Sequence, residues 1–314
     1  FMKAIIFPGQ GSQIVGMGKE FYDNFASVKE IFQKADDKLN YKLSKIILEG
    51  PEDDLKLTMN TQPAILVVSL SIYEIFKKEL NINLEKDIKY FAGHSLGEYS
   101  ALVASNSLKL DDAIYLLHER GKAMQESVPV GEGKMLAVLG LNLEDLEKYI
   151  EKISDKNICE IANDNAVGQI IVSGDTNSIE KLQNQLKSDS KKSILLPVSA
   201  PFHCSLMQKA AKRMEKKINS INFSKPSKEI MGNVNASPYS EPLEIKEMLL
   251  KQIYSKVRWR ESMINMSKKG VKQFIEIGPG KALTGMVKRT IKDTNTFSIN
   301  SLNDIKKLND ELEK

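Results

Sequence analysis

The stretch Ile88-Lys89-Tyr90-Phe91-Ala92-Gly93-His94-Ser95-Leu96-Gly97 reads as a buried strand that ends in a sharp turn. A helix is expected from Glu98 to about Ser105, so the Gly-x-Ser-x-Gly pattern lies between a strand and a helix. Glycines two positions before and after the serine let the neighbouring backbone approach closely. The following helix directs N–H groups and its positive dipole end at the turn. The pattern predicts a nucleophile at Ser95, with a purely structural turn as the alternative.

Further strands and helices extend this unit in both directions along the chain. Strands are predicted at Ala4–Phe7, Glu229–Asn233 and Gln273–Ile277, and helical stretches at about Leu206–Ile218 and Leu243–Met266. This alternation is typical of an α/β layer with a mostly parallel sheet.

A long apolar helix is predicted to open at Thr61-Gln62-Pro63. Thr61 is expected as its N-cap and Pro63 in its first turn, where a missing N–H does no harm.

Residues 128–198 show a different order of elements, β-α-β-β-α-β, within a short length of chain. The predicted strands are Lys134–Leu139, Ile158–Ala162, Gln169–Ser173 and Ser193–Val198, and the predicted helices are Leu143–Ile153 and Ser178–Leu186. This order indicates an inserted ferredoxin-like subdomain. The larger α/β subdomain is then discontinuous and comprises residues 1–127 and 199–314.

Composition excludes several classes of function. The 314 residues carry a formal net charge of +4, which is too balanced to indicate nucleic-acid binding. The longest apolar stretch, Ala64–Leu70, is far shorter than the ~20 residues that cross a bilayer, so no membrane association is expected. Cys159 and Cys204 form no Cys-x-x-Cys pair and no metal cluster is visible, which favours a reducing cytoplasm and no bound metal.

A serine nucleophile needs a base, and the chain has only 3 histidines. His94 precedes Ser95 directly, so its side chain should leave the turn in another direction. His118 lies in the middle of a predicted helix, where a packed or surface role is more common. His203 lies on a loop after a predicted strand and is the best candidate. No Asp or Glu partner for it can be chosen from spacing, and a carbonyl group is an alternative.

The early loop Pro8-Gly9-Gln10-Gly11-Ser12-Gln13 lacks a phosphate-binding pattern, because Ile14 occupies the sixth position of Gly-x-Gly-x-x-Gly. A backbone N–H from this loop, paired with the N–H of Leu96, would form an oxyanion hole. The alternative is a tight turn at the end of a sheet. Three cations near the C-terminus are candidates for phosphate or an acidic partner, or for plain solvated charge: Lys281, Lys288 and Arg289.

Taken together, these segments resemble the malonyl-CoA:acyl carrier protein transacylases of fatty acid synthesis. The resemblance rests on motifs that occur in family order over nearly the whole chain. They are Phe7-Pro8-Gly9-Gln10-Gly11-Ser12-Gln13, Thr61-Gln62-Pro63-Ala64, Gly93-His94-Ser95-Leu96-Gly97-Glu98-Tyr99-Ser100-Ala101-Leu102, Arg120-Gly121, Phe202-His203-Cys204 and Gly278-Pro279-Gly280-Lys281-Ala282-Leu283.

The resemblance implies an α/β-hydrolase-like core with an inserted ferredoxin-like lobe, in agreement with the pattern of elements. It implies that Ser95 is the nucleophile and His203 the base. It assigns the oxyanion N–H groups to Gln10 and Leu96. It also implies that the carbonyl of Gln252 orients the histidine.

The resemblance further implies that Arg120 grips the free carboxylate of malonate. From the residues alone, Arg120 borders an apolar helix face and could equally be a surface or a buried arginine. A planar guanidinium can pair both carboxylate oxygens at once, which lysine cannot. Met124, Asn163 and Phe202 are implied near the substrate pocket.

The implied reaction is a ping-pong transfer through a malonyl-serine ester, from malonyl-CoA to the phosphopantetheine thiol of acyl carrier protein. Coenzyme A and phosphopantetheine are then substrate carriers, and no metal or redox cofactor is expected. A monomer is expected. Three alternatives remain: a serine esterase or thioesterase on the same core, a non-catalytic carrier-binding protein, and an acyltransferase that serves polyketide synthesis.

Overall fold

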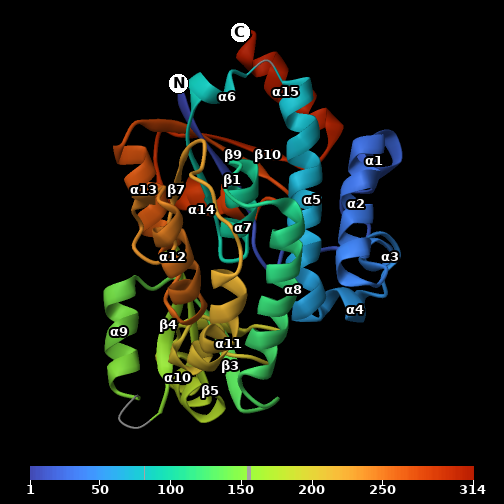
Figure 1. Ribbon diagram of the computed structural model, residues 1–314. Coiled ribbons are helices and arrows are strands. Elements are labelled where there is room, and N and C mark those ends of the chain that lie inside the picture. Colours follow the sequence, from blue (N-terminus) through green and yellow to red (C-terminus); the bar gives the residue numbers. More distant parts are fainter. Residues whose placement is uncertain (81, 154–156) are drawn as a thin grey trace.

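A six-stranded sheet forms the centre of the larger body in the computed structural model, which describes residues 1–80, 82–153 and 157–314 (Figure 1). The strand order is β10-β9-β1-β2-β7-β8, and all neighbours are parallel except β7 and β8. The strands are β1 (Met2–Phe7), β2 (Ile88–Gly93), β7 (Glu229–Met231), β8 (Pro238–Tyr239), β9 (Val271–Ile277) and β10 (Asn295–Ile299). The predicted mostly parallel α/β sheet is confirmed.

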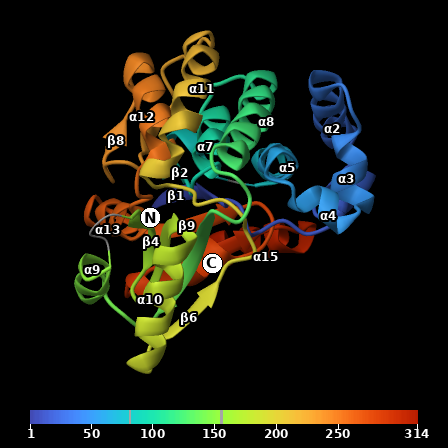
Figure 2. The same ribbon diagram turned by 90° about the horizontal axis from the view of Figure 1, so that it is seen from below.

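Helices cover both faces of this sheet (Figure 2). Alternate residues of β1 show why, because Ile5 and Phe7 belong to one buried cluster and Ala4 and Ile6 to another. The first cluster includes side chains of α5 (Thr58–Glu79), α7 (Gly97–Ala104) and α8 (Leu110–Glu126). The second includes side chains of α13 (Trp259–Lys268) and α14 (Ala282–Thr290). A strand that is apolar on both sides is therefore buried on both sides.

A second, antiparallel sheet has the strand order β4-β5-β3-β6 and lies at one end of the molecule (Figure 1). Its elements are β3 (Gly133–Leu139), α9 (Leu143–Glu151), β4 (Cys159–Ala166), β5 (Gln169–Asp175), α10 (Thr176–Ser188) and β6 (Lys192–Leu195). Order along the chain and order in the sheet are those of a ferredoxin-like unit. That part of the predicted fold is also confirmed, whereas the limits 128 and 198 stay a prediction.

The end of β4 joins the two sheets. Asn163 forms an isolated parallel bridge with Val257 of the larger body. The buried Asp164 pairs with Arg260 at 2.9 Å, and Asn165 Oδ1 lies 2.6 Å from the Nε2 of His94. Three consecutive polar residues therefore anchor the small sheet beside the serine turn.

Other helices complete the larger body, and none of the described helices is long and apolar enough to cross a membrane. They are α1 (Lys19–Asn24), α2 (Ala26–Leu39), α3 (Leu43–Glu49), α4 (Glu52–Lys56), α6 (Leu84–Asp87), α11 (Gln208–Asn219), α12 (Pro242–Tyr254), α15 (Leu302–Leu312) and a short 3-10 helix, Ser205–Met207.

Two expected helix boundaries are wrong. The helix α5 begins at Thr58 with Leu57 as N-cap, so Thr61 is not the cap and Pro63 lies inside the helix. Burial of the residues before the proline stabilises this additional turn. The single helical region expected at 243–266 is two helices, because the chain breaks where Val257 pairs with β4.

Candidate active site

The serine turn holds Ser95 in a left-handed backbone conformation, with φ of 52°. This turn needs glycine on either side. A Cβ on Gly93 would lie 1.8 Å from the carbonyl oxygen of Gly97, and a Cβ on Gly97 would lie 2.3 Å from that of Phe7. The helix α7 begins directly behind the serine, at Gly97. The turn therefore lifts one hydroxyl out at the carboxyl end of β2, as the sequence pattern predicts.

The structure brings His203 to this hydroxyl. Its Nε2 lies 2.7 Å from Ser95 Oγ, although the residues are 108 positions apart in the chain. Its Nδ1 lies 2.9 Å from the carbonyl oxygen of Gln252. A carbonyl only accepts, so Nδ1 carries the proton and the lone pair of Nε2 faces the serine. The imidazole is therefore arranged to take a proton from the hydroxyl.

The position of Gln252 explains why its carbonyl is free. It lies in the last turn of α12, where the final four carbonyls have no partner within a helix. The negative end of the helix dipole also points toward the imidazole there, which favours a protonated ring during reaction.

Burial governs the charge of the histidine. His203 is 4% exposed, and burial lowers its pKa to about 3, with the charge of Arg120 as the second cause. The ring is therefore neutral near pH 7 and can act as a base. His203 also has a left-handed φ, of 57°, so the loop presents it in a sparsely populated conformation.

Arg120 lies in the same site and is fully buried. Its Nη2 donates to Ser95 Oγ at 3.3 Å and to Gln252 Oε1 at 2.7 Å, and its Nη1 donates to Gln62 Oε1 at 2.7 Å. The guanidinium lies 5.6 Å from the centre of the Tyr99 ring. Nε has no partner among the described residues. A cation with an unpaired donor thus lies beside the nucleophile.

Gln10 and Leu96 flank the serine turn. The backbone N–H of His94 donates to the carbonyl of Phe7 at 3.0 Å, which places the end of β1 and the following loop next to the turn. Leu96 is the N-cap of α7. Within the described part of the chain, neither backbone N–H, of Gln10 or of Leu96, donates to a protein acceptor. Two free amides are therefore available at this point.

The remaining predicted site residues, Met124, Asn163 and Phe202, are buried. Met124 is 1% exposed, and its sulfur lies 3.7 Å from Gln62 Nε2. Asn163 lies on β4, where it bridges to the larger body. Phe202 precedes the base, and its carbonyl accepts from Ser173 Oγ at 2.6 Å.

The other histidines lie elsewhere, as expected from elimination. His94 points away from the nucleophile to Asn165 and packs against Trp259. His118 contacts Glu119 and the ring of Tyr41.

The other cation and thiol candidates also lie outside the dyad. Lys281, Lys288 and Arg289 have exposed side chains. Cys204 is a buried free thiol, as is Cys159.

Sequence reasoning gave no role to Gln62, Glu98 or Asn233, although all three are buried in the site. Asn233 Oδ1 accepts from the Ser95 N–H at 2.8 Å, and its Nδ2 donates to the Gly93 carbonyl at 2.8 Å. Gln62 lies in the Thr61-Gln62-Pro63-Ala64 motif and Glu98 in the motif that begins at Gly93, so the sequence offered a signal for both. Asn233 had none.

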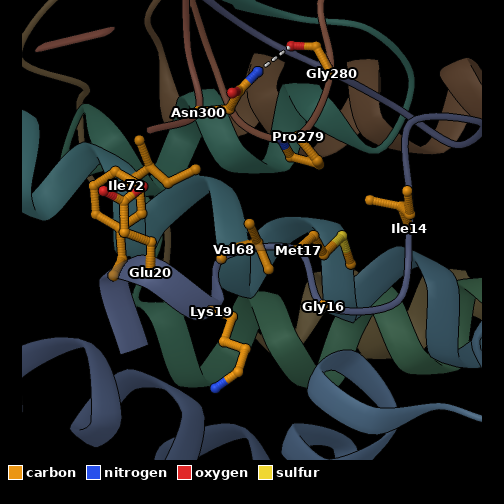
Figure 3. Close-up of a pocket in the computed structure, with 12 residues that line it drawn as sticks. Ile14, Gly16, Met17, Lys19, Glu20, Val68, Ile72, Pro279, Gly280 and Asn300 are labelled. Carbon is orange, nitrogen blue, oxygen red and sulfur yellow. Dashed lines mark hydrogen bonds between the residues drawn. The ribbon is translucent and has the colours of Figure 1, made fainter. Parts of the chain in front are cut away.

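A separate cavity of about 270 Å³ lies beyond the Gln10 loop, between residues 14–21, α5 and residues 279–280 (Figure 3). Ile14, Met17 and Val68 line it with apolar side chains, and Asn300 donates to the Gly280 carbonyl at 3.1 Å. It contains none of the predicted site residues, so it is distinct from the dyad.

A serine on a strand–helix turn, a neutral histidine on its hydroxyl and two free amides define a site for acyl transfer. Residues 4–311 match the family described as acyl transferase domain.

Three more specific comparisons agree. Malonyl CoA-acyl carrier protein transacylase of Bacillus subtilis (strain 168) is 42% identical over 298 residues, which cover 94% of this chain and 92% of that protein. The crystal structure of acyl-carrier-protein-S-malonyltransferase from Bartonella henselae is 41% identical, covers 100% of both chains and superposes with a TM-score of 0.96.

A third structure, of a type II PKS acyl-carrier protein in complex with its malonyl-transacylase, is 34% identical with a TM-score of 0.94 and covers 99% of this chain and 100% of that one. The chain belongs to the malonyl CoA-acyl carrier protein transacylase family, and it is an acyltransferase.

Proposed function

We propose that this acyltransferase moves a malonyl group from malonyl-CoA to the phosphopantetheine thiol of acyl carrier protein, through an ester on Ser95, and so supplies fatty acid elongation. The main observation behind the proposal is that one hydroxyl contacts both the base and a buried cation. Ser95 Oγ contacts the base His203 at 2.7 Å and the guanidinium of Arg120 at 3.3 Å. An acyl group on this oxygen therefore has a cation within reach of its far end.

In the first half-reaction, Ser95 Oγ attacks the thioester carbon while Nε2 of His203 takes the hydroxyl proton. The negative oxygen of the tetrahedral intermediate is bound by the free amides of Gln10 and Leu96. When the C–S bond breaks, the thiolate of coenzyme A takes the proton from His203. A malonyl-serine ester and free coenzyme A remain.

In the second half-reaction, the phosphopantetheine thiol of the carrier loses its proton to His203 and attacks the ester carbon. The bond to Ser95 Oγ breaks, and the proton passes from His203 to the serine. The products are the malonyl thioester of the carrier and the free enzyme. No proton, electron or metal ion has to be supplied, so the proposal includes no cofactor.

The malonyl carboxylate supports this chemistry through the charge of Arg120. That charge is the second cause of the low pKa of His203. An anion paired with Arg120 offsets it, so the pKa of His203 rises toward the reaction pH when malonyl-CoA binds. A base whose pKa lies nearer the working pH transfers protons more effectively. A substrate without the carboxylate gives no such effect.

The remaining assignments follow from placement. Met124, Asn163 and Phe202 are proposed to line the space for the acyl chain and pantetheine. A single chain contains the dyad, Arg120 and both amides, which supports a monomer as the active unit. Two buried free thiols support a reducing cytoplasm as its location.

Intact-mass measurement after mixing with malonyl-CoA tests the proposal. The protein is expected to gain one malonyl group, and the Ser95→Ala variant none. Added holo acyl carrier protein should remove the group much faster than water does. Equal loss in buffer alone would identify a thioesterase, and no gain in mass would identify a non-catalytic carrier-binding protein. Carriers from fatty acid and polyketide synthesis, compared side by side, determine which one it serves.

A further inference from the structure

Glu98 is a buried carboxylate that the transfer chemistry does not use. It is 0% exposed and lies at the start of α7, directly behind the serine turn. Its Oε2 accepts from Tyr239 OH at 2.6 Å, and its Oε1 accepts from the Asn233 N–H at 2.9 Å and from Gln252 Nε2 at 3.3 Å. Burial raises the pKa of Glu98, and these three hydrogen bonds and the nearby charge of Arg120 act against that rise. Three surrounding donors and a nearby cation favour the ionised carboxylate.

The amide of Gln252 has only one possible orientation. A guanidinium only donates, so the contact of Arg120 Nη2 at 2.7 Å must be to Oε1. Nε2 then faces Glu98 and also donates to the Ser95 carbonyl at 3.0 Å. One side-chain amide therefore connects the cation to the carboxylate.

Arg120 has no carboxylate in direct contact among the described residues. Its direct partners are Gln62, Gln252 and the serine hydroxyl, all neutral. Burial lowers the pKa of Arg120, and electrostatic interactions with Tyr99 and Glu98 act against that shift. A buried cation without a compensating anion is strongly destabilising, so Arg120 needs a counter-charge within the protein.

We propose that Glu98 is a positioning residue, whose buried carboxylate holds Arg120 through the Gln252 amide and neutralises the site until an anionic acyl group binds. The identity of that anion, a malonyl chain, rests on the proposed function. The electrostatic link between Glu98 and Arg120 does not depend on the proposed function. The carboxylate of the substrate then shares the cation with a resident anion. Affinity for the acyl group is moderated, which favours its release to the carrier.

Glu98→Gln tests this role, because it removes the charge and keeps a hydrogen-bonded contact at each partner, with the direction of the Tyr239 contact reversed. The new amide oxygen can accept from Asn233 and Gln252, and the new amide nitrogen can donate to the Tyr239 oxygen. Tyr239→Phe is the matched control, because it removes one hydrogen bond and leaves the charge.

In Glu98→Gln the cation has no resident competitor, so KM for malonyl-CoA is expected to fall by about threefold to tenfold. Its kcat should fall as well, because the ester is held more tightly. KM for acetyl-CoA, which has no free carboxylate, should stay unchanged. Free malonate should raise the melting temperature of this variant more than that of the wild type or of Tyr239→Phe. An unchanged or higher KM for malonyl-CoA would overturn the proposal.

A charge-balanced double variant keeps the test valid if Glu98→Gln does not fold. Glu98→Gln with Arg120→Met has no buried charge at either position, so it should melt higher than Glu98→Gln alone, or fold where that variant does not. Additive losses, or a double variant that also fails to fold, would contradict the pairing. This measurement uses no substrate. If Ser95 gains no malonyl group, the proposed function fails while the stability comparison still decides the role of Glu98.

Discussion

The turn that carries Ser95 and the loop that carries His203 hold their residues in the same left-handed backbone region, with φ of 52° and 57°, by different means. The serine turn is bound by side chains. Asn233 contacts both the Ser95 N–H and the Gly93 carbonyl, and Gln252 donates to the Ser95 carbonyl at 3.0 Å. Hydrogen bonds from distant elements over-determine the strained conformation.

Besides the nucleophile, the ring of His203 contacts backbone groups, of which the carbonyl of Gln252 lies at 2.9 Å and Ser255 also acts on its pKa. Its other support is packing, because the adjacent Phe202 and Cys204 are buried. The same burial lowers the pKa of His203. The serine turn is therefore fixed by directed hydrogen bonds, whereas the histidine is held by packing, and burial sets its pKa. Substitutions that crowd the backbone should therefore disrupt the serine turn. Changes in charge or pH should mainly affect the histidine.

The largest effect is expected at the base. His203→Ala should slow malonylation of Ser95 by about 10²- to 10⁴-fold, because the hydroxyl loses its proton acceptor. Single-turnover mass measurement gives the rate, and the far-ultraviolet spectrum should remain that of the wild type. A rate within tenfold of the wild type would show that another group acts as the base.

The second largest effect is expected from crowding the backbone at the serine turn. Gly93→Ala places a Cβ 1.8 Å from the Gly97 carbonyl, so unfolding free energy should fall by about 3 kcal/mol or more. Gly285→Ala in α14 is the control, since a Cβ there meets nothing within 4 Å and alanine favours a helix by roughly 0.8–1.0 kcal/mol. Denaturant unfolding measures both. Similar stability of the two variants would mean that the turn is not tight.

The cation beside the turn should affect selectivity rather than the chemistry in general. Arg120→Ala is expected to reduce malonyl transfer about 10- to 100-fold, because a charge-assisted contact contributes roughly 1.5–3 kcal/mol. Transfer of acetyl from acetyl-CoA, which lacks the carboxylate, should be spared. Comparing kcat/KM for the two substrates checks this. A parallel fall in both would remove the selectivity role.

The smallest effect is a pH dependence of stability from the histidine loop. Burial lowers the pKa of His203 from 6.5 to about 3, so the unfolded chain binds its proton first as the pH falls. Stability is therefore present above pH 6.5 and is lost toward pH 3. Between pH 6.5 and 5.5 the loss should be roughly 1 kcal/mol. The change of unfolding free energy with pH, measured by denaturant unfolding, should be smaller in His203→Gln. An equal change in both proteins would mean that other groups cause it.

Some features were predictable because they depend on neighbours in the chain. The Gly-x-Ser-x-Gly turn follows from local sterics, and the β-α-β-β-α-β order of residues 128–198 follows from periodicity. Elimination among three histidines pointed to His203. The assignment of Gln252 came only from the family resemblance, since a backbone carbonyl is present at every position and carries no pattern.

Other features were decided by contacts between distant segments. The break at Val257 exists because β4 pairs there, and α5 begins early because its first turn is buried. Strand β10 was not predicted, and helix α15 was missed although Leu302, Ile305 and Leu308 have helical spacing. Asn233 reaches the serine across 138 positions, and Gln252 reaches it across 157.

The sequence alone therefore pointed to the residue that we propose as nucleophile and to the residue type that can serve as its base, because a sharp turn and a titratable ring are properties of local chemistry. Only the tertiary structure decided that Arg120 is buried at the nucleophile and linked to Glu98 through one amide. The physical reason is that the charge state and orientation of a buried side chain depend on every donor and acceptor around it. Those partners are set by packing, not by their order in the chain.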